Sequence, residues 1–328
     1  MPEWISSFPG YSQLVRRLKK ILGGIICTGP IPRHVGVIMD GNRRYARTHK
    51  IELKEGHNLG FDTMASILEL LYESGVECAT VYAFSIENFK RLKYEVEWLM
   101  DLAKSKLRQI SQHGDLCDQY GIRIRILGNT LLLPSDVRKI LRETEEMTKH
   151  NTKAVLNVCF PYTLRDEIAH SVKSVVEEAS QDASVVIDES TIDRHLYTAD
   201  SPPVDILIRT SGTYRLLDFL LWQLVPSTCA IVFSDKMWPE FSTWDMTRIL
   251  LNWSFNTYWY GAGSGQTMEK VGRAEVKRVE GSIERIQSSE PGSLTAYERY
   301  AMDSDSDSRS DKADTVTSVS LPEKEREK

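Results

Sequence analysis

Short apolar runs alternate with longer helical patterns between residues 35 and 256, and this alternation limits the fold more than any other feature. Each apolar run has the length of a strand, and each helical stretch is long enough to connect two parallel strands. The runs are continuously apolar, which is typical of strands that are covered on both faces. The pattern therefore predicts an α/β fold with a central, mostly parallel six-stranded sheet flanked by helices.

The predicted strands are 35–39, 78–84, 122–127, 154–159, 204–208 and 229–233. The predicted helices have a 3.6-residue period and lie near 58–74, 93–113, 135–150, 164–179, 189–196 and 242–256. We expect three parts in all: an amphipathic segment over 1–30, one domain over 31–260 and a polar, largely disordered tail over 261–328.

Composition excludes several classes of protein. A net charge of -5 over 328 residues does not favour a general nucleic-acid binder. The five cysteines are dispersed and form no C-x-x-C pair, so we expect reduced thiols rather than a disulfide framework or a zinc site. No apolar run reaches the roughly 18 residues that a membrane span needs, and the N-terminus lacks a signal-peptide pattern. These observations predict a body that faces the cytosol.

The N-terminal segment is basic and amphipathic. Its apolar residues recur at helical spacing among four cations: Leu14, Leu18, Ile21, Leu22 and Ile25 against Arg16, Arg17, Lys19 and Lys20. Such a helix suits a membrane surface, and it is equally compatible with packing against a partner or against the domain itself. In the tail, Asp303, Asp305 and Asp307 have the spacing of a metal-binding motif, but low-complexity sequence around them favours disorder.

The first predicted strand ends abruptly in polar residues: Asp40, Gly41, Asn42, Arg43 and Arg44. Ligands of open α/β sheets bind beyond the carboxyl ends of the strands. Gly41 permits close approach of an anion, the helix that follows favours negative charge at its start, and both arginines can fork onto phosphate oxygens. Asp40 suits Mg2+, which prefers few carboxylates plus substrate phosphates. The sequence is thus compatible with a diphosphate and Mg2+ site, or with a capped helix carrying exposed arginines.

Further polar clusters recur along the chain. They are the pair Gly56-His57 ahead of the helix predicted from 58, the cluster Ser85, Glu87, Asn88 and Arg91, and the cluster Arg209, Ser211 and Arg215. Because parallel strands end at the same edge of a sheet, we expect these groups to converge on two phosphate-bearing substrates. Neither a P-loop nor a G-x-G-x-x-G after a strand is present, which disfavours the common nucleotide sites.

Five motifs in order resemble the cis-prenyltransferase (undecaprenyl diphosphate synthase) family over residues 30–256. They are HVGVIMDGNRRYA at 34–46, GH at 56–57, YAFSIENFKR at 82–91, IRTSG with RLLDFLLWQ at 208–223, and WPEF at 238–241. GNRRYA and NVCFPYTLRDE are more similar to the eukaryotic dolichol branch than to the bacterial one.

The resemblance implies the catalytic subunit of a dehydrodolichyl diphosphate synthase. Such an enzyme condenses isopentenyl diphosphate units in cis onto farnesyl diphosphate, for dolichol synthesis and protein glycosylation. By resemblance, Asp40 holds Mg2+, residues 41–44 and His57 bind the allylic diphosphate, and Asn88 lies near the proton that is removed. Arg209 and Arg215 match the pair that grips isopentenyl diphosphate.

The resemblance also implies a hydrophobic tunnel between the helices at 58–74 and 93–113. Their apolar residues at helical spacing suit either core or tunnel: Phe61, Met64, Ile67, Leu68, Leu71, Val96, Leu99, Met100 and Leu102. The long apolar product implies peripheral attachment to the endoplasmic reticulum membrane, on its cytosolic face.

The sequence departs from the family pattern at several positions. Thr213 replaces a common glutamate, Leu217 replaces a serine that helps to hold isopentenyl diphosphate, and Leu53 replaces a bacterial arginine. The region FNTYWYGAG contains no arginine where homodimers of the family carry R-x-G. We therefore predict a heteromer with an accessory Nogo-B receptor-type subunit that supplies R-x-G. The alternatives are a non-catalytic scaffold subunit, against which the retained Asp40 speaks, and an unrelated anion-binding module.

Overall fold

The computed structural model describes residues 17, 21–112, 115–182, 184–225, 229–261 and 269–270. The chain divides into two compact units, Met1–Val271 and Gly272–Lys328, and every described residue belongs to the first. Most of the predicted N-terminal segment and nearly all of the predicted polar tail, with its three aspartates, lie outside the described residues.

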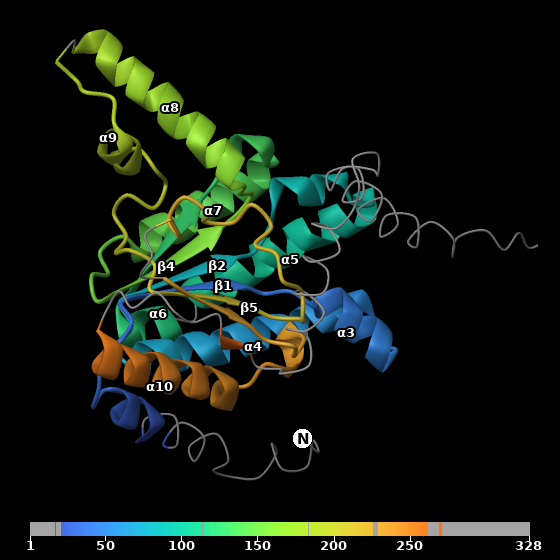
Figure 1. Ribbon diagram of the computed structural model, residues 1–328. Helices are drawn as coiled ribbons and strands as arrows, with labels where there is room; N and C mark the ends of the chain where they lie inside the picture. Colours follow the sequence, from blue (N-terminus) through green and yellow to red (C-terminus); the bar gives the residue numbers. More distant parts are fainter. Residues whose placement is uncertain are drawn as a thin grey trace, which may run out of the picture. The chain divides into compact units, whose positions relative to one another are not determined.

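A parallel sheet forms the centre of the first unit (Figure 1). Its strands are β1 (His34–Ile38), β2 (Cys78–Tyr82), β3 (Ile122–Leu127), β4 (Ala154–Cys159), β5 (Ile206–Arg209), β6 (Ala230–Phe233) and β7 (Glu269–Lys270). They lie in the order β3-β4-β2-β1-β5-β6-β7, and each pair of neighbours is parallel. The six predicted strands are confirmed, and the two-residue β7 is an addition at the edge.

The helices connect these strands. They are α3 (Asn42–His49), α4 (Leu53–Glu73), α5 (Lys93–Gln112), α6 (Asp115–Tyr120), α7 (Ser135–Thr148), α8 (Leu164–Gln181), α9 (Glu189–Arg194) and α10 (Thr243–Tyr260). Three short 3-10 turns, η1 (Ile86–Lys90), η2 (Thr130–Leu132) and η3 (Trp238–Glu240), follow strand ends or loops. Residues 21–26 are helical as well. Among the described residues, no helix combines the length and apolarity that a bilayer span requires.

The predicted start of the helix at residue 58 is wrong. Helix α4 begins at Leu53, so Gly56 and His57 lie within its first turns rather than ahead of it. Glycine destabilises a helix interior, but at this position it permits close contact between α3 and α4. A Cβ built on Gly56 would lie 2.9 Å from the carbonyl oxygen of Asn42. The missing side chain thus allows α3 and α4 to pack closely together.

The sheet is covered on both faces, as its continuously apolar strands require. One face carries the larger core, in which residues of β1, β2, β3 and β5 pack with α4, α7 and α10. The other face is covered by the segment around 216–224 and by Tyr162. All five cysteines are free thiols, and Cys78, Cys117 and Cys159 are buried core residues.

The candidate tunnel residues divide into two groups. Met64, Ile67, Leu68, Leu71 and Met100 are buried core residues, whereas Phe61, Val96 and Leu99 are only partly buried and pack against the core from its margin. Helix α4 packs on α3, η3 and α10, while α5 packs on α7, α6 and η1. The tunnel itself stays a prediction, for which Phe61, Val96 and Leu99 are the best-placed lining residues.

Candidate active site

The carboxyl ends of β1 and β5 bring the two most important charges together. These strands are neighbours with Ile38 opposite Arg209, so Asp40, two residues beyond β1, faces the last residue of β5. Arg209 donates from Nη2 to Asp40 Oδ2 at 2.7 Å. The arginine side chain is 1% exposed and that of the aspartate 32%, so the ion pair lies at the boundary between the core and the surface. The predicted convergence of Asp40 and Arg209 is confirmed.

The main chain of Asp40 is fixed by Thr210 and Trp238. Asp40 N donates to Thr210 Oγ1 at 3.1 Å, and that hydroxyl donates to Asp40 O at 2.8 Å. Trp238 N also donates to Asp40 O at 3.0 Å, while its indole Nε1 donates to the carbonyl of Gly60 at 2.7 Å. The WPEF motif therefore positions the acid, a role that the sequence analysis did not assign. Thr210 was also missed, although it lies within the quoted IRTSG motif.

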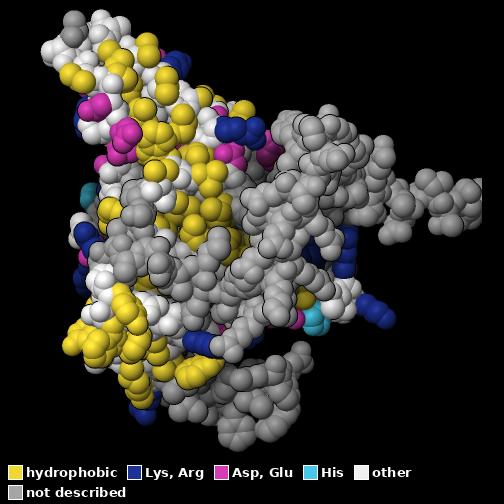
Figure 2. Space-filling view, in the orientation of Figure 1, with side chains coloured by type: hydrophobic (Ala, Val, Ile, Leu, Met, Phe, Trp, Pro, Cys, Tyr) yellow, Lys and Arg dark blue, Asp and Glu magenta, His cyan; other side chains and the backbone are white. Residues whose placement is uncertain are grey.

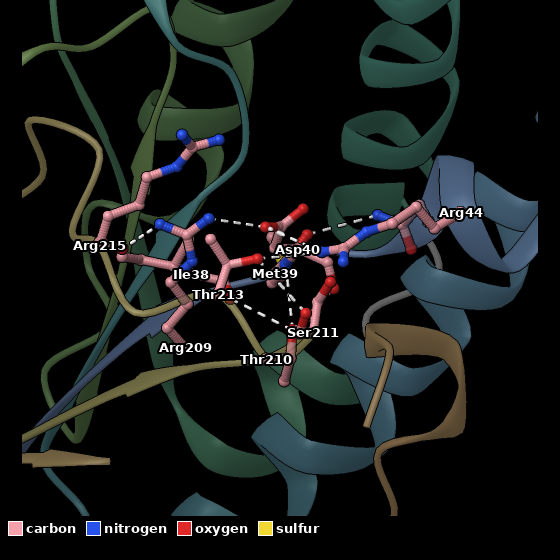
Figure 3. A network of polar contacts seen from close by, with 10 residues as sticks. Ile38, Met39, Asp40, Arg44, Arg209, Thr210, Ser211, Thr213 and Arg215 are labelled. Carbon is pink, nitrogen blue, oxygen red and sulfur yellow. Dashed lines mark hydrogen bonds and ion pairs between the residues drawn. The ribbon is translucent and has the colours of Figure 1, made fainter. Parts of the chain in front are cut away.

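Two arginines flank the Asp40 carboxylate, Arg209 on one side and Arg44 on the other (Figure 3). Arg44 Nη2 lies 3.6 Å from Oδ2, the same oxygen that Arg209 contacts. Burial lowers the pKa of Arg209, and the neighbouring Asp40 carboxylate opposes that shift, so the ion pair keeps a buried guanidinium charged.

The loop after β5 completes the environment of Arg209. Its Nη1 donates to the backbone carbonyl of Arg215, whose exposed side chain extends past the Arg209 guanidinium (Figure 3). Two buried polar atoms here have no partner within the described residues, Arg209 Nε and Ser211 Oγ. Since a buried unsatisfied donor is costly, these atoms indicate a place for a hydrogen-bonding ligand.

Helix α3 begins at Asn42 after the N-cap residue Gly41, and its start has no side-chain cap. Gly41 has φ 108° and ψ -4°, makes no side-chain cap, and is followed by a first turn without acids. A Cβ built there would lie 3.0 Å from the Cα of Met237, so both conformation and space require glycine. Asn42 Oδ1 is buried without a partner among the described residues. A helix start without a side-chain cap and with arginines beside it suits an anion, and anion binding here stays a prediction.

A buried glutamate, Glu95, lies between two further arginines of the site. Glu95 of α5 is 7% exposed, and its Oε1 lies 3.0 Å from Arg91 Nη1 and 3.8 Å from Arg43 Nε. Burial lowers the pKa of Arg91, and the negative charges of Glu95 and Asp40 oppose that shift. Glu95 was missed by the sequence analysis; its signal was its i+4 spacing from Arg91.

His57 is held neutral at physiological pH. Burial, followed by the positive charges of Arg91 and Arg43, lowers its pKa to about 4. The imidazole lies beside the ring of Trp98, with 5.4 Å between ring centroids. His57 is thus suited to donate one N–H to a phosphate oxygen and is not an additional cation.

The side chains of the Ser85–Arg91 cluster have different orientations. Ser85 Oγ accepts from Glu87 N at 3.1 Å, and Asn88 Oδ1 accepts from Ser85 N at 3.0 Å, so both form a capping box around η1. Glu87 is exposed and pairs with Lys90 at 2.5 Å and with Arg165 at 3.3 Å. A substrate contact for Ser85, Glu87 or Asn88 stays a prediction; the amide nitrogen of Asn88 is the group that the capping box leaves available.

Thr213 and Leu217, the two positions after β5 that depart from the family pattern, both form hydrogen bonds within the chain. Thr213 Oγ1 accepts from Arg44 Nη2 at 3.3 Å and donates to the carbonyl of Ser211 at 3.4 Å. Leu217 has φ 51°, and its carbonyl accepts from Tyr82 Oη at 3.3 Å. Thr213 thereby links the two arginine-bearing loops, and Leu217 contributes through its backbone.

The carboxylate at Asp40 fits a magnesium ion that is shared with a substrate. Both arginine contacts fall on Oδ2, and one third of the side chain is exposed. No cluster of three or more potential metal-ligating side chains occurs within the described part of the chain. A single carboxylate with adjacent phosphate-binding groups is the arrangement in which Mg2+ takes its remaining ligands from phosphate and water.

Comparison with known proteins decides the family. The model of the undecaprenyl diphosphate synthase family matches residues 38–261, which contain every polar cluster described above. This chain belongs to the cis-prenyltransferase family. It is therefore a transferase, and the family is generally Mg2+-dependent.

Relatives and solved structures agree with this assignment. A dehydrodolichyl diphosphate synthase complex subunit of Schizosaccharomyces pombe is 47% identical, covering 76% of this chain and 95% of that protein. The corresponding complex subunit of Homo sapiens is 44% identical, covering 73% of this chain and 72% of that protein. The crystal structure of lavandulyl diphosphate synthase from Lavandula x intermedia with dimethylallyl diphosphate superposes with a TM-score of 0.64 at 27% identity, covering 68% of this chain and 95% of that one.

Proposed function

We propose that this cis-prenyltransferase is the catalytic subunit of a dehydrodolichyl diphosphate synthase. It condenses isopentenyl diphosphate onto farnesyl diphosphate and makes a long polyprenyl diphosphate for dolichol synthesis. Two relatives that are more than 40% identical carry the name of such a complex subunit. The observation that carries the proposal is the Asp40–Arg209 ion pair, which lies next to Arg44 and to the loop that carries Arg215.

The first group binds the diphosphate that leaves. When an allylic diphosphate ionises, negative charge develops on the leaving group, and fixed positive groups stabilise it most effectively. The uncapped start of α3, Arg43 held by Glu95, Arg44 and neutral His57 supply these groups. Mg2+ bound at Asp40 would add Lewis-acid stabilisation of the same charge. Asp40 would hold that ion, and Thr210 and Trp238 fix the backbone of Asp40.

The second group binds the incoming isopentenyl diphosphate. Arg209 and Arg215 supply the cationic contacts, and the unpartnered Ser211 Oγ and Arg209 Nε supply further donors. We assign Asn88 the position near the carbon that loses a proton, and its bond with Ser85 would hold the side chain in place there. Adjacent sites for both diphosphates would give the reacting carbons a defined relative position, which lowers the entropic part of the barrier.

The alternative assigns this chain as a non-catalytic scaffold in the same complex. Retention of Asp40, with its fixed backbone and flanking arginines, favours the catalytic role, because a scaffold has no need for a partly exposed acid held in this way.

Activity is expected to depend on a second, related subunit that supplies R-x-G. The end of α10 and the residues after it, FNTYWYGAG at 255–263, contain no arginine where the resemblance implies R-x-G at the diphosphate site. We expect the purified chain to incorporate radiolabelled isopentenyl diphosphate with farnesyl diphosphate and Mg2+ at a low rate. Co-expression with an R-x-G subunit should raise that rate by roughly tenfold or more, which is the typical effect of adding one transition-state contact.

The control is the same co-expressed pair with the arginine of R-x-G replaced by alanine in the partner. Loss of the stimulation would assign it to this residue rather than to solubility. Full long-chain synthesis by the chain alone would refute the heteromer, and no synthesis in any combination would refute the catalytic role.

Glu95 is expected to act as a positioning residue for the first diphosphate group. Glu95→Gln removes the buried negative charge that holds Arg43 and Arg91 while keeping the size of the side chain. We expect KM for farnesyl diphosphate to rise roughly tenfold with a smaller change in kcat, as for loss of uniform binding. Steady-state kinetics with each substrate varied separately would check this, and Glu97→Gln, at an exposed position on the same helix, is the matched control. An unchanged KM for farnesyl diphosphate would contradict the assigned role.

We further propose peripheral attachment to the endoplasmic reticulum membrane, on its cytosolic face. A product of many isoprene units does not stay in water, so the complex has to deliver it to a bilayer. The basic N-terminal segment before residue 27 supports this proposal.

A further inference from the structure

Helix α10 is apolar on two faces, and the described part of the chain covers only one of them. Its inner face packs on the domain through Met246, Leu250 and Ser254, which are buried. A second stripe at helical spacing faces outward, and its apolar members are 39–70% exposed: Trp244, Leu251, Phe255, Tyr258 and Trp259. We call these five residues, together with Arg248 between them, the outer α10 stripe.

The helical segment 21–26 extends this surface. Leu22 and Ile26 pack inward, whereas Ile21 and Ile25 are 60% and 50% exposed. The segment that follows lies against the buried face of α10, because Gly29 packs directly on Ser254. Figure 2 shows hydrophobic side chains gathered over the C-terminal end of α10 and the adjacent N-terminal segment. The apolar surface therefore has contributions from two parts of the chain.

The two stretches of sequence that contribute this surface carry more cations than acids. The protein as a whole is acidic, with a net charge of -5, yet residues 11–33 contain five cations and no acid. Helix α10 contains a single acid, Asp245, which caps the helix and pairs with Lys236 at 2.7 Å. Arg248 is exposed within the stripe. The surface is thus complementary to anionic groups.

We propose that the outer α10 stripe, with Ile21 and Ile25, is a surface that binds an anionic lipid bilayer. Tryptophan and tyrosine combine an apolar ring with a polar group and therefore favour the boundary between hydrocarbon and headgroups. Exposed apolar residues on a helix whose one acid is paired with Lys236, in a chain whose residues 11–33 carry five cations and no acid, match the pattern of interfacial helices. This inference rests on the membrane attachment proposed above and adds a contact that the N-terminal segment alone does not provide.

Vesicle binding by the full-length chain with its partner subunit tests this surface. We expect sedimentation with phosphatidylcholine vesicles that contain phosphatidylserine, and weaker sedimentation with phosphatidylcholine alone. The double substitution Phe255→Ser and Trp259→Ser should weaken partitioning roughly tenfold or more, because two large apolar groups no longer enter the bilayer. The matched control is Val172→Ser with Val176→Ser, an exposed pair four residues apart on α8, which should leave binding unchanged.

A second measurement tests whether the indole ring of Trp259 enters the bilayer. Trp259→Phe should retain vesicle binding but lose part of the tryptophan quenching by brominated lipids that the wild-type chain shows. Condensation activity in detergent should be unchanged in the double variant, since these residues lie outside the active site.

The results that would contradict membrane attachment differ from those that would contradict the role of α10. If the wild-type complex does not bind vesicles, the proposed membrane attachment itself is wrong. If it binds, and the double variant binds equally well or Trp259→Phe retains the full quenching, only the role of α10 is wrong. If the double substitution instead separates the subunits, the stripe is a protein interface and this proposal is overturned.

Discussion

Replacing Asp40 by alanine is expected to abolish condensation while the protein stays folded. The substitution removes the carboxylate proposed to hold Mg2+ at the leaving diphosphate, and that charge stabilisation is worth several kcal/mol in the transition state. We expect kcat to fall by roughly 10³-fold or more. Single-turnover incorporation of radiolabelled isopentenyl diphosphate, with the partner subunit present, would measure the loss.

Stability provides the control for this substitution. Asp40→Ala leaves the buried Arg209 Nη2 without its acceptor, which is expected to cost about 1–3 kcal/mol of unfolding free energy. Asp40→Asn keeps an oxygen that can accept from Arg209 and should unfold close to the wild type, yet it should be nearly as inactive because the amide is uncharged. If Asp40→Asn retains substantial activity, the catalytic reading is wrong and the scaffold alternative gains support.

Arg209→Lys is expected to have the second largest effect. Arg209 uses separate nitrogens for Asp40 and for the carbonyl of Arg215, and its Nε is free for a ligand. A lysine has one nitrogen and cannot reproduce this fork. We expect kcat/KM for isopentenyl diphosphate to fall roughly 10²–10³-fold.

Arg215→Lys provides a graded comparison with this variant. Its side chain is exposed and keeps a positive charge after the substitution, so we expect a loss of only about tenfold, mostly in KM. Initial rates with isopentenyl diphosphate varied at saturating farnesyl diphosphate would separate the two variants. Equal, small effects of both substitutions would show that Arg209 is only a structural partner of Asp40.

The sequence determined the fold class and the main charges of the site. Continuous apolar runs separated by helical patterns are sufficient to predict a parallel sheet, because only strands covered on both faces tolerate them. Asp40 and Arg209 were predicted to meet, since each directly follows or ends a parallel strand and such ends share one edge of the sheet. The physical reason is local: strand length, polarity and the residue at the strand end are all encoded in short segments.

Tertiary structure decided what the sequence left open. No local pattern indicated that Thr210 and Trp238 fix the backbone of Asp40, since these bonds join residues about 170 or more positions apart in the chain. The start of α4 at Leu53 likewise depends on the packing of Gly56 against α3, which overrides the helix-breaking tendency of glycine.

The roles of charged side chains also required the folded chain. Glu95 appeared in the sequence as one more acid on a helix, and only burial between Arg43 and Arg91 shows that it organises a binding group. The exposure of the outer face of α10 also became visible only in the folded chain, because the sequence shows the apolar residues of this helix but not which of them are exposed. Sequence by itself determined which residues carry charge and where strands end; packing decided which of those charges meet, because burial and contact depend on residues far apart in the chain.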